Sequence, residues 1–328
     1  MGIDQIDYIA KYVTSAYVSV VFIELAKEWP KLMQYWRNVE TDMKGYGFPR
    51  GLNRRITILI AFFMVTFSVE YILHQASRMA RALSCHTDAA KSIKFFFGNL
   101  TLSHVFDYIP YNIPTSLVFQ YWFCQMEFAF TYTDVFVMVI SMCLASRIKQ
   151  VTNRIKLASK KQVMNEAVWK SLRKDYTRLE TLVELVNDKI SNIILVSFLP
   201  NIFTILTQVF STLKPKHNLL ESVYFYVSLI FLLSRTVMVC ICGAMVNEES
   251  RKPLHILNSV HHSVYNEEID IFVNQLLNFE ITMSGKHFFK IKRYVILELA
   301  GAIVTYELVL IQFNRESLNT QSKSTRCV

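Results

Sequence analysis

Long apolar runs separated by short charged stretches dominate the pattern of this 328-residue chain. Six runs reach or approach the ~17–25 residues that a helix needs to cross a bilayer. They cover residues 8–26, 56–73, 117–145, 190–212, 222–246 and 294–313. The pattern therefore predicts an all-α membrane protein with six transmembrane helices.

Lys and Arg are distributed unevenly between these runs. Residues 27–55, 146–189 and 247–293 hold 24 of the 35, whereas the alternating stretches 74–116, 213–221 and 314–328 hold 9. Since cytoplasmic loops of membrane proteins carry the excess of Lys and Arg, the first set is predicted to be cytosolic and both termini extracellular. The sequon Asn99-Leu100-Thr101 falls in a predicted outer stretch, so Asn99 is a candidate glycosylation site.

Two predicted cytosolic stretches have a helical periodicity of their own. Apolar residues recur three and four positions apart at Trp169, Leu172, Tyr176, Leu179, Leu182, Val183 and Val186. A similar stripe is expected across 268–290, at Ile269, Phe272, Leu276, Phe279 and Phe288. Because an apolar stripe needs a surface to pack against, we expect long helix extensions that form a cytosolic anchor domain. The alternative is helices that lie on the lipid headgroups.

Composition agrees with a membrane protein. The chain is 52% hydrophobic and 19% charged, against about 25% charged in a soluble domain. A net charge of +9 suggests an acidic partner, but membrane topology accounts for the basic stretches and no nucleic-acid partner is expected. The first run lacks the features of a cleavable signal peptide. Of six cysteines, four lie in predicted spans, and Cys85 and Cys327, both predicted outside, could pair.

The last run carries polar residues that hydrocarbon disfavours. Glu298, Thr305 and Gln312 are seven positions apart and share one helical face. That face could line a pore or form hydrogen bonds within one subunit. Glu307 points roughly 140° away from Gln312, at 100° per residue, which favours a structural role in packing or subunit contact.

Motifs along nearly the whole chain resemble those of insect gustatory receptors. The last run contains Thr305-Tyr306-Glu307-Leu308-Val309, followed by Gln312-Phe313, which resembles the C-terminal signature in the form typical of the sugar-receptor subfamily. Other matches, in the family's order, are Trp29-Pro30-Lys31-Leu32-Met33, Tyr35-Trp36, Val39-Glu40, Glu70-Tyr71-Ile72-Leu73-His74, Asp134-x-Phe136, Ser141, Tyr176-x-x-Leu179, Arg235, Glu248-Glu249-Ser250 and Ser284-Gly285-x-x-Phe288-Phe289.

The resemblance implies a function that composition alone does not. It implies a non-selective cation channel of taste neurons, located in the plasma membrane and opened by mono- or disaccharides. A homo- or hetero-tetramer with other gustatory receptors is expected, in contact with membrane lipid and without a cofactor. Gln312 and Phe313 would form the gate, with Thr305 on the pore face.

Two features depart from the family pattern. The family has seven spans and an inner amino terminus, and the motif order indicates that the missing span is the first. A truncated, non-conducting or regulatory subunit is therefore an alternative. In addition, Phe130-Thr131 stands where the family often has Trp-Asn.

A sugar site needs aromatic faces for the ring and carboxylates or amides for its hydroxyls. A group built to bond a hydroxyl also rejects analogues that lack it. Candidates toward the outer ends of the spans are Glu70, His74, Tyr121, Trp122, Thr131, Tyr132, Asp134, Gln208, Tyr224 and Tyr226. Tyr121 and Trp122 could instead belong to an aromatic belt at the membrane surface, and Asp134 to an ion pair within the bundle.

Arg235 lies mid-span and must be compensated. Glu298, Glu307 or a backbone carbonyl are its candidate partners, and a structural role is favoured.

These interpretations divide the chain by role. Residues 1–145 and 190–246 would form the ligand-binding bundle, 146–189 and 247–293 the anchor, 294–313 the pore helix and 314–328 a disordered tail. A multi-span transporter is an alternative, but its repeats or broken helices are not evident in a chain with 8 Gly and 7 Pro. A G-protein-coupled receptor would have the opposite carboxyl-terminal orientation.

Enzyme and metal chemistry find no support in the sequence. No catalytic triad, carboxylate pair or nucleotide loop meets the requirements of an enzyme. His255, His261 and His262 lack acidic or cysteine ligands in register, so no metal site is expected.

Overall fold

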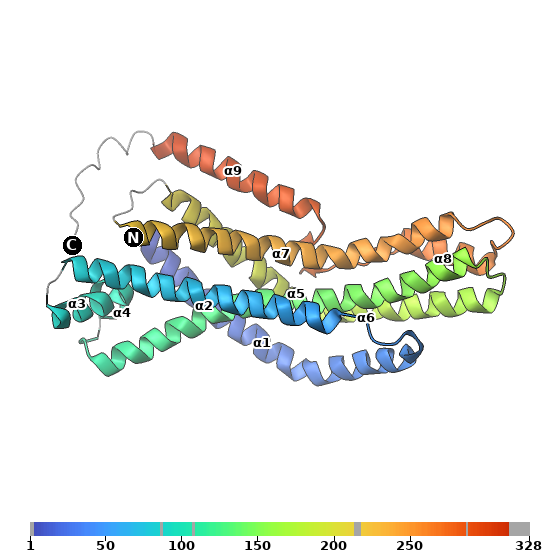
Figure 1. The fold of residues 1–328 in the computed structure, drawn as a ribbon, viewed down its shortest axis with the longest axis horizontal. Coiled ribbons are helices and arrows are strands. Elements are labelled where there is room, and N and C mark those ends of the chain that lie inside the picture. Colours follow the sequence, from blue (N-terminus) through green and yellow to red (C-terminus); the bar gives the residue numbers. More distant parts are fainter. Residues whose placement is uncertain (1–2, 86–87, 107–108, 213–217, 287, 315–328) are drawn as a thin grey trace.

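The protein is an elongated bundle of long helices, seen in a computed structural model that describes residues 3–85, 88–106, 109–212, 218–286 and 288–314 (Figure 1). The long helices are α1 (Ile3–Asp42), α2 (Leu52–Cys85), α5 (Ile113–Lys160), α6 (Glu166–Ser211), α7 (Leu219–Asn258) and α9 (Tyr294–Asn314). Shorter elements are the 3₁₀-helix η1 (Lys44–Tyr46), α3 (Ala89–Phe95), the π-helix η2 (Phe96–Thr101), α4 (Ser103–Phe106), α8 (Glu267–Asn278) and the strands β1 (Ser284–Gly285) and β2 (Phe289–Lys290).

Each of the six apolar runs lies within one of the long helices. Within the described residues, four helices are long and apolar enough to cross a membrane, namely α2, α5, α6 and α7. The all-α class is therefore confirmed, whereas the six-span count is not.

Three of these helices continue well beyond their apolar runs. We call residues 137–160 of α5, 166–194 of α6 and 239–258 of α7 the inner half of the bundle. Ile148, Val151, Ile155 and Trp169 have no exposed surface there. The stripe that begins at Trp169 is buried as predicted, because it packs against α1, α5 and α7.

The prediction of a second amphipathic helix across 268–290 is correct only for its first half. Helix α8 ends at Asn278, and the described residues 279–286 and 288–293 after it are not helical. They include one antiparallel pair of strands, in which Gly285 lies opposite Phe289. Phe279 and Phe288, predicted on a buried stripe, are 60% and 80% exposed. Tertiary hydrogen bonds to α6 and α7 replace helical ones here, and glycine is a poor helix former.

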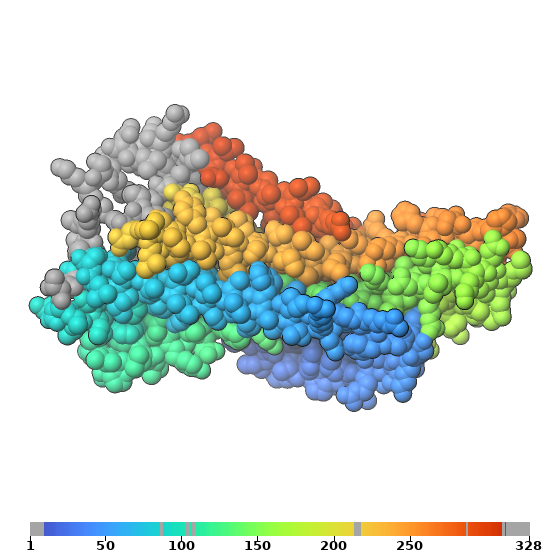
Figure 2. All heavy atoms as spheres, in the orientation of Figure 1, coloured from blue at the N-terminus to red at the C-terminus, as the bar shows by residue number. Residues whose placement is uncertain are grey.

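Helix α9 lies on the outside of the bundle, beside α7, and Figure 2 shows it as a ridge along that side. It contacts α6 and α7, and Val295, Ile296, Leu299 and Ile303 belong to or pack against the buried clusters. Leu297, Val304 and Leu308 are exposed. In a single chain, most of the described side chains of this helix are therefore exposed.

Candidate functional site

A cavity of about 670 Å³ opens between α1, α2, α5, α6 and α7, in the half of the bundle that the charge pattern predicts to face outside. We call this part the outer half. Five of the predicted ligand residues line the cavity: Glu70, His74, Thr131, Gln208 and Tyr224. They come from four helices, so the sequence brings them together only through the fold.

A hydrogen-bonded chain of polar groups forms one wall. The Ser228 hydroxyl donates to Glu70 Oε1 at 2.6 Å, and Gln208 Nε2 donates to Ser228 Oγ at 3.1 Å. The other amide atom, Gln208 Oε1, is buried and has no hydrogen-bond partner among the described residues. A buried polar atom without a partner costs about 1–3 kcal/mol, so this oxygen favours a ligand that donates a hydrogen bond.

Aromatic rings stand beside this polar wall. The His74 ring lies 5.0 Å from the Tyr224 ring and 6.0 Å from the Phe123 ring, measured between centroids. All three residues line the cavity. Apolar faces and hydrogen-bonding groups therefore meet in one space, as in small-molecule sites generally.

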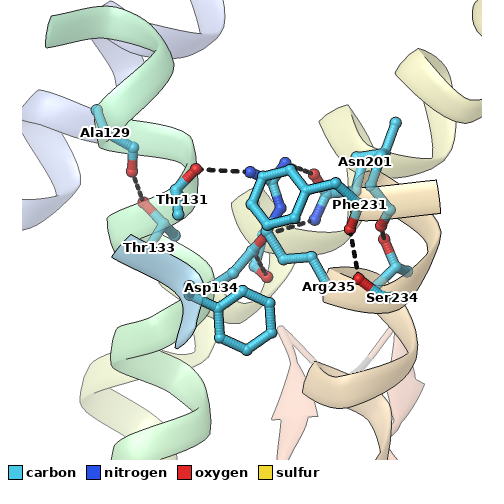
Figure 3. Close-up of polar contacts among 12 residues, drawn as sticks. Ala129, Thr131, Thr133, Asp134, Asn201, Phe231, Ser234 and Arg235 are labelled. Atoms are coloured by element: carbon cyan, nitrogen blue, oxygen red, sulfur yellow. Dashed lines mark hydrogen bonds and ion pairs between the residues drawn. The ribbon is translucent and has the colours of Figure 1, made fainter. Parts of the chain in front are cut away.

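The floor of the cavity is a buried ion pair (Figure 3). Arg235 Nε lies 2.7 Å from Asp134 Oδ2, and the guanidinium donates to Thr131 Oγ1 at 2.8 Å and to Asn201 Oδ1 at 2.9 Å. Asp134 also accepts hydrogen bonds from Ser197 Oγ and, at 2.8 Å, from Asn201 Nδ2. The network joins α5, α6 and α7, and Arg235 is the member of the ion pair that reaches the cavity.

This floor corrects two sequence-based interpretations. The predicted partners of Arg235, which were Glu298, Glu307 or a backbone carbonyl, are wrong, because the partner is Asp134. For Asp134 itself, the alternative of an ion pair within the bundle is what the structure contains. Both carboxylate oxygens of Asp134 accept hydrogen bonds from protein groups. Asp134 therefore lies beneath the cavity surface and does not line the cavity.

Several cavity residues were missed in the sequence. Lys11 and Glu127 form an ion pair at 3.4 Å across the cavity, between α1 and α5. Asn201 and Thr207 of α6 and Ser228 of α7 also line it. In the sequence, the only indication that these residues could line a site was a polar side chain within an apolar run.

The remaining aromatic candidates lie elsewhere. Trp122, Tyr132 and Tyr226 are exposed and are not among the residues around the cavity, and Tyr121 is exposed as well. For Tyr121 and Trp122 this position agrees with the alternative of an aromatic belt. We therefore leave these residues out of the site.

Most of the predicted gate and glycosylation residues that the structure describes lie on the surface of the chain. Thr305 and Gln312 are exposed on α9, Glu307 is half-buried, and Asn99 is exposed in η2. The side chain of Phe313 and the whole of Cys327 lie outside the described residues, so their roles stay predictions.

Comparisons with known proteins agree with this fold and identify a family. The family model described as trehalose receptor matches residues 1–327. In Drosophila melanogaster, the gustatory receptor for sugar taste 64f is 32% identical over 92% of this chain and 64% of its own length. The gustatory receptor 5a for trehalose is 29% identical over 96% of this chain and 71% of its own. This chain thus spans about two thirds of those relatives.

A solved structure supports the fold. The insect olfactory receptor OR5 from Machilis hrabei superposes with a TM-score of 0.64 at 15% identity, over 95% of this chain and 81% of that one. Its complex with eugenol gives a TM-score of 0.62 at 14% identity, over 93% and 79%.

Several helices of membrane-spanning length, in a chain whose relatives are receptors, define a multi-pass membrane receptor rather than an enzyme. The chain belongs to the trehalose receptor family, within the sugar gustatory receptors of insects.

Proposed function

We propose that the chain is a subunit of a sugar-gated, non-selective cation channel in the plasma membrane of taste neurons. The observation that carries this proposal is the buried Gln208 carbonyl oxygen, which no described residue bonds, beside the Glu70–Ser228 hydrogen bond and the His74 and Tyr224 rings. The printed names of its relatives, which refer to sugar taste and trehalose, support the same ligand class.

A sugar fits the chemistry of this wall. A hydroxyl can donate to Gln208 Oε1, a second can bond the Glu70 carboxylate, and the C–H face of the ring can stack on the aromatic side chains. A volume of about 670 Å³ lies within the usual range of small-molecule sites, ~300–1,000 Å³, and suits a mono- or disaccharide. A deoxy analogue would leave a site group without its partner, which gives selectivity for the intact sugar.

The pore in this proposal is formed by α9 at the axis of a tetramer. The exposed side chains of Thr305 and Gln312 would face the axis, and Phe313 would supply an aromatic constriction. Constrictions of this kind open through small helix displacements that rewet the pore.

The experiment is calcium imaging of cells that express the chain, alone and with a second gustatory receptor, against a panel of mono- and disaccharides that includes trehalose. We expect a response to at least one sugar, and we expect Gln208→Leu to require higher concentrations of it. Tyr226→Phe, on the exposed surface, is the control and should behave as wild type. Surface-expressed protein that responds to no sugar in either setting would overturn the proposal.

A further inference from the structure

Residues 279–286 and 288–293, between α8 and α9, are fastened to the cavity helix α6. We call these residues the strap. Asn187 Nδ2 donates to Ser284 Oγ at 3.0 Å, and the Ser284 backbone N–H donates back to Asn187 Oδ1 at 2.7 Å. The Phe198 and Phe289 rings meet at 4.9 Å between centroids. The strap therefore follows any movement of this part of α6.

Gly285 leaves room for the Phe289 ring, which packs on α6. A Cβ added there would lie 2.7 Å from the Phe289 ring and at an ordinary contact distance of 3.5 Å from the Leu195 Cα atom. A side chain at this position would displace the Phe289 ring and disturb its contact with Phe198 of α6.

The strap is fastened equally to α7. Ile291 is fully buried over Gly243, where an added Cβ would lie 2.8 Å from Ile291 Cγ2. Asn247 Nδ2 donates to the Ile281 carbonyl at 3.1 Å. An ion pair between Arg293 and Glu248 ties the last strap residue to α7, directly before α9 begins at Tyr294.

Charge strengthens this attachment. Glu280 pairs with Lys292 at 2.8 Å, with Lys290 at 3.3 Å and with Arg251 of α7. Burial tends to raise the pKa of Glu280, but the hydrogen bonds from the three cations outweigh it and hold the pKa at about 2. The carboxylate therefore stays ionised at every physiological pH.

The same two helices line the cavity at their other ends. Helix α6 supplies Asn201 and Gln208, and α7 supplies Ser228 and Arg235. Pro200 of α6 lines the cavity itself and lies between the strap contacts at Asn187 and Phe198 and the polar cavity residues Asn201 and Gln208. Proline has no backbone N–H, so it removes one helical hydrogen bond and creates a point where the two parts of α6 can bend.

From these contacts we infer that the strap transmits the state of the cavity to α9, with Asn187, Gly243 and Gly285 as positioning residues. A shift of α6 against α7 on sugar binding moves the strap, and the strap moves the start of α9. This inference rests on the proposed function, because it supplies the link between its binding site and its pore.

The experiment separates sugar binding from channel opening. Gly285→Ala and Gly243→Ala are compared with wild type for surface expression, binding of radiolabelled trehalose or of the strongest sugar of the panel, and maximal sugar-evoked current. We expect the maximal current to fall at least about fivefold, within the range of coupling energies between sites, while binding is unchanged. Gly98→Ala is the matched control, because nothing lies within 4 Å of an added Cβ there.

A second substitution distinguishes a loss of coupling from a general structural defect. Ile291→Ala removes the methyl groups that the new Cβ of Gly243→Ala would strike, so the double variant should recover current. If a glycine variant does not reach the surface, Asn187→Ala carries the same prediction without added volume.

Variants that bind sugar and conduct as well as wild type would overturn the inference. A wild-type protein that neither binds nor responds to any sugar would instead overturn the proposed function.

Discussion

The outer and inner halves of the bundle share helices α5, α6 and α7, yet they differ in what they bury. The outer half contains a cavity of about 670 Å³, whose walls hold an ion pair and a buried amide oxygen that has no partner among the described residues. The inner half is filled by apolar side chains such as Ile155 and Trp169. A void with polar walls costs stability, and a packed core provides it. We therefore propose that ligand binding and stability are separated along the length of these three helices.

The largest effect on stability is expected from a substitution in the ion pair at the boundary between the two halves. Arg235→Ala leaves the Asp134 carboxylate buried without its cation, which costs about 3–5 kcal/mol. We expect loss of most folded protein, measured by size-exclusion chromatography and thermal unfolding in detergent. The double variant Asp134→Asn/Arg235→Gln removes both charges and should recover folding. Unchanged stability of the single variant would show that the ion pair does not hold α5 and α7 together.

The inner half should affect stability alone. Ile155→Ala opens a cavity at a fully buried position and should cost about 2–5 kcal/mol in the free energy of unfolding. The sugar concentration for half-maximal response of the protein that reaches the surface should not change. A clear shift in that concentration would break the separation of roles.

The outer half should show the reverse behaviour. Glu70→Gln replaces the carboxyl group of the hydrogen-bonded wall, and a buried polar group left without its partner costs about 1–3 kcal/mol. The half-maximal sugar concentration should therefore rise about 10–100-fold. The temperature of unfolding without sugar should stay close to wild type. A wild-type concentration response would remove Glu70 from the site.

The pH dependence of stability distinguishes the strap from both halves. The ordinary pKa of Glu280 is 4.5 and its pKa in the fold is about 2, so its ion pairs stabilise the protein fully above the ordinary value. This stabilisation is lost as the pH falls from about 4.5 toward 2. The difference in unfolding temperature between wild type and Glu280→Gln should thus be constant above about pH 5 and shrink below it. A difference that varies between neutral pH and that limit would contradict the assignment.

The smallest effect is expected on the exposed surface. Trp122→Phe should change stability by less than about 0.5 kcal/mol and leave the sugar response unaltered, because the side chain is exposed and lies away from the cavity. Loss of sugar response in this variant would place the site elsewhere.

The sequence predicted the helices better than their faces. Apolar runs located all six long helices, and the stripe from Trp169 identified the inner packing face of α6. In a membrane protein, however, a helix is apolar toward lipid and toward the core alike. Periodicity therefore could not tell that His74 and Tyr224 face the cavity while Trp122 and Tyr226 face outward.

Contacts between residues far apart in the chain could not be predicted from the sequence for a different reason. The ion pair between Asp134 and Arg235 joins positions on two helices whose register depends on the whole bundle. The strap was mistaken for a helix because its backbone hydrogen bonds go to side chains of α6 and α7, which no local pattern reveals.

The account depends most directly on sugar occupying the cavity, and thiol protection measures this. Thr207 lines the cavity from α6, so a water-soluble thiol reagent should modify Thr207→Cys. Wild type is the background control, because Cys124 and Cys143 are only partly buried and can react as well, whereas Cys240 and Cys242 are buried. The account predicts that a sugar that opens the channel slows this modification several-fold and that a non-activating sugar does not. An unchanged rate in the presence of a saturating, activating sugar would contradict it.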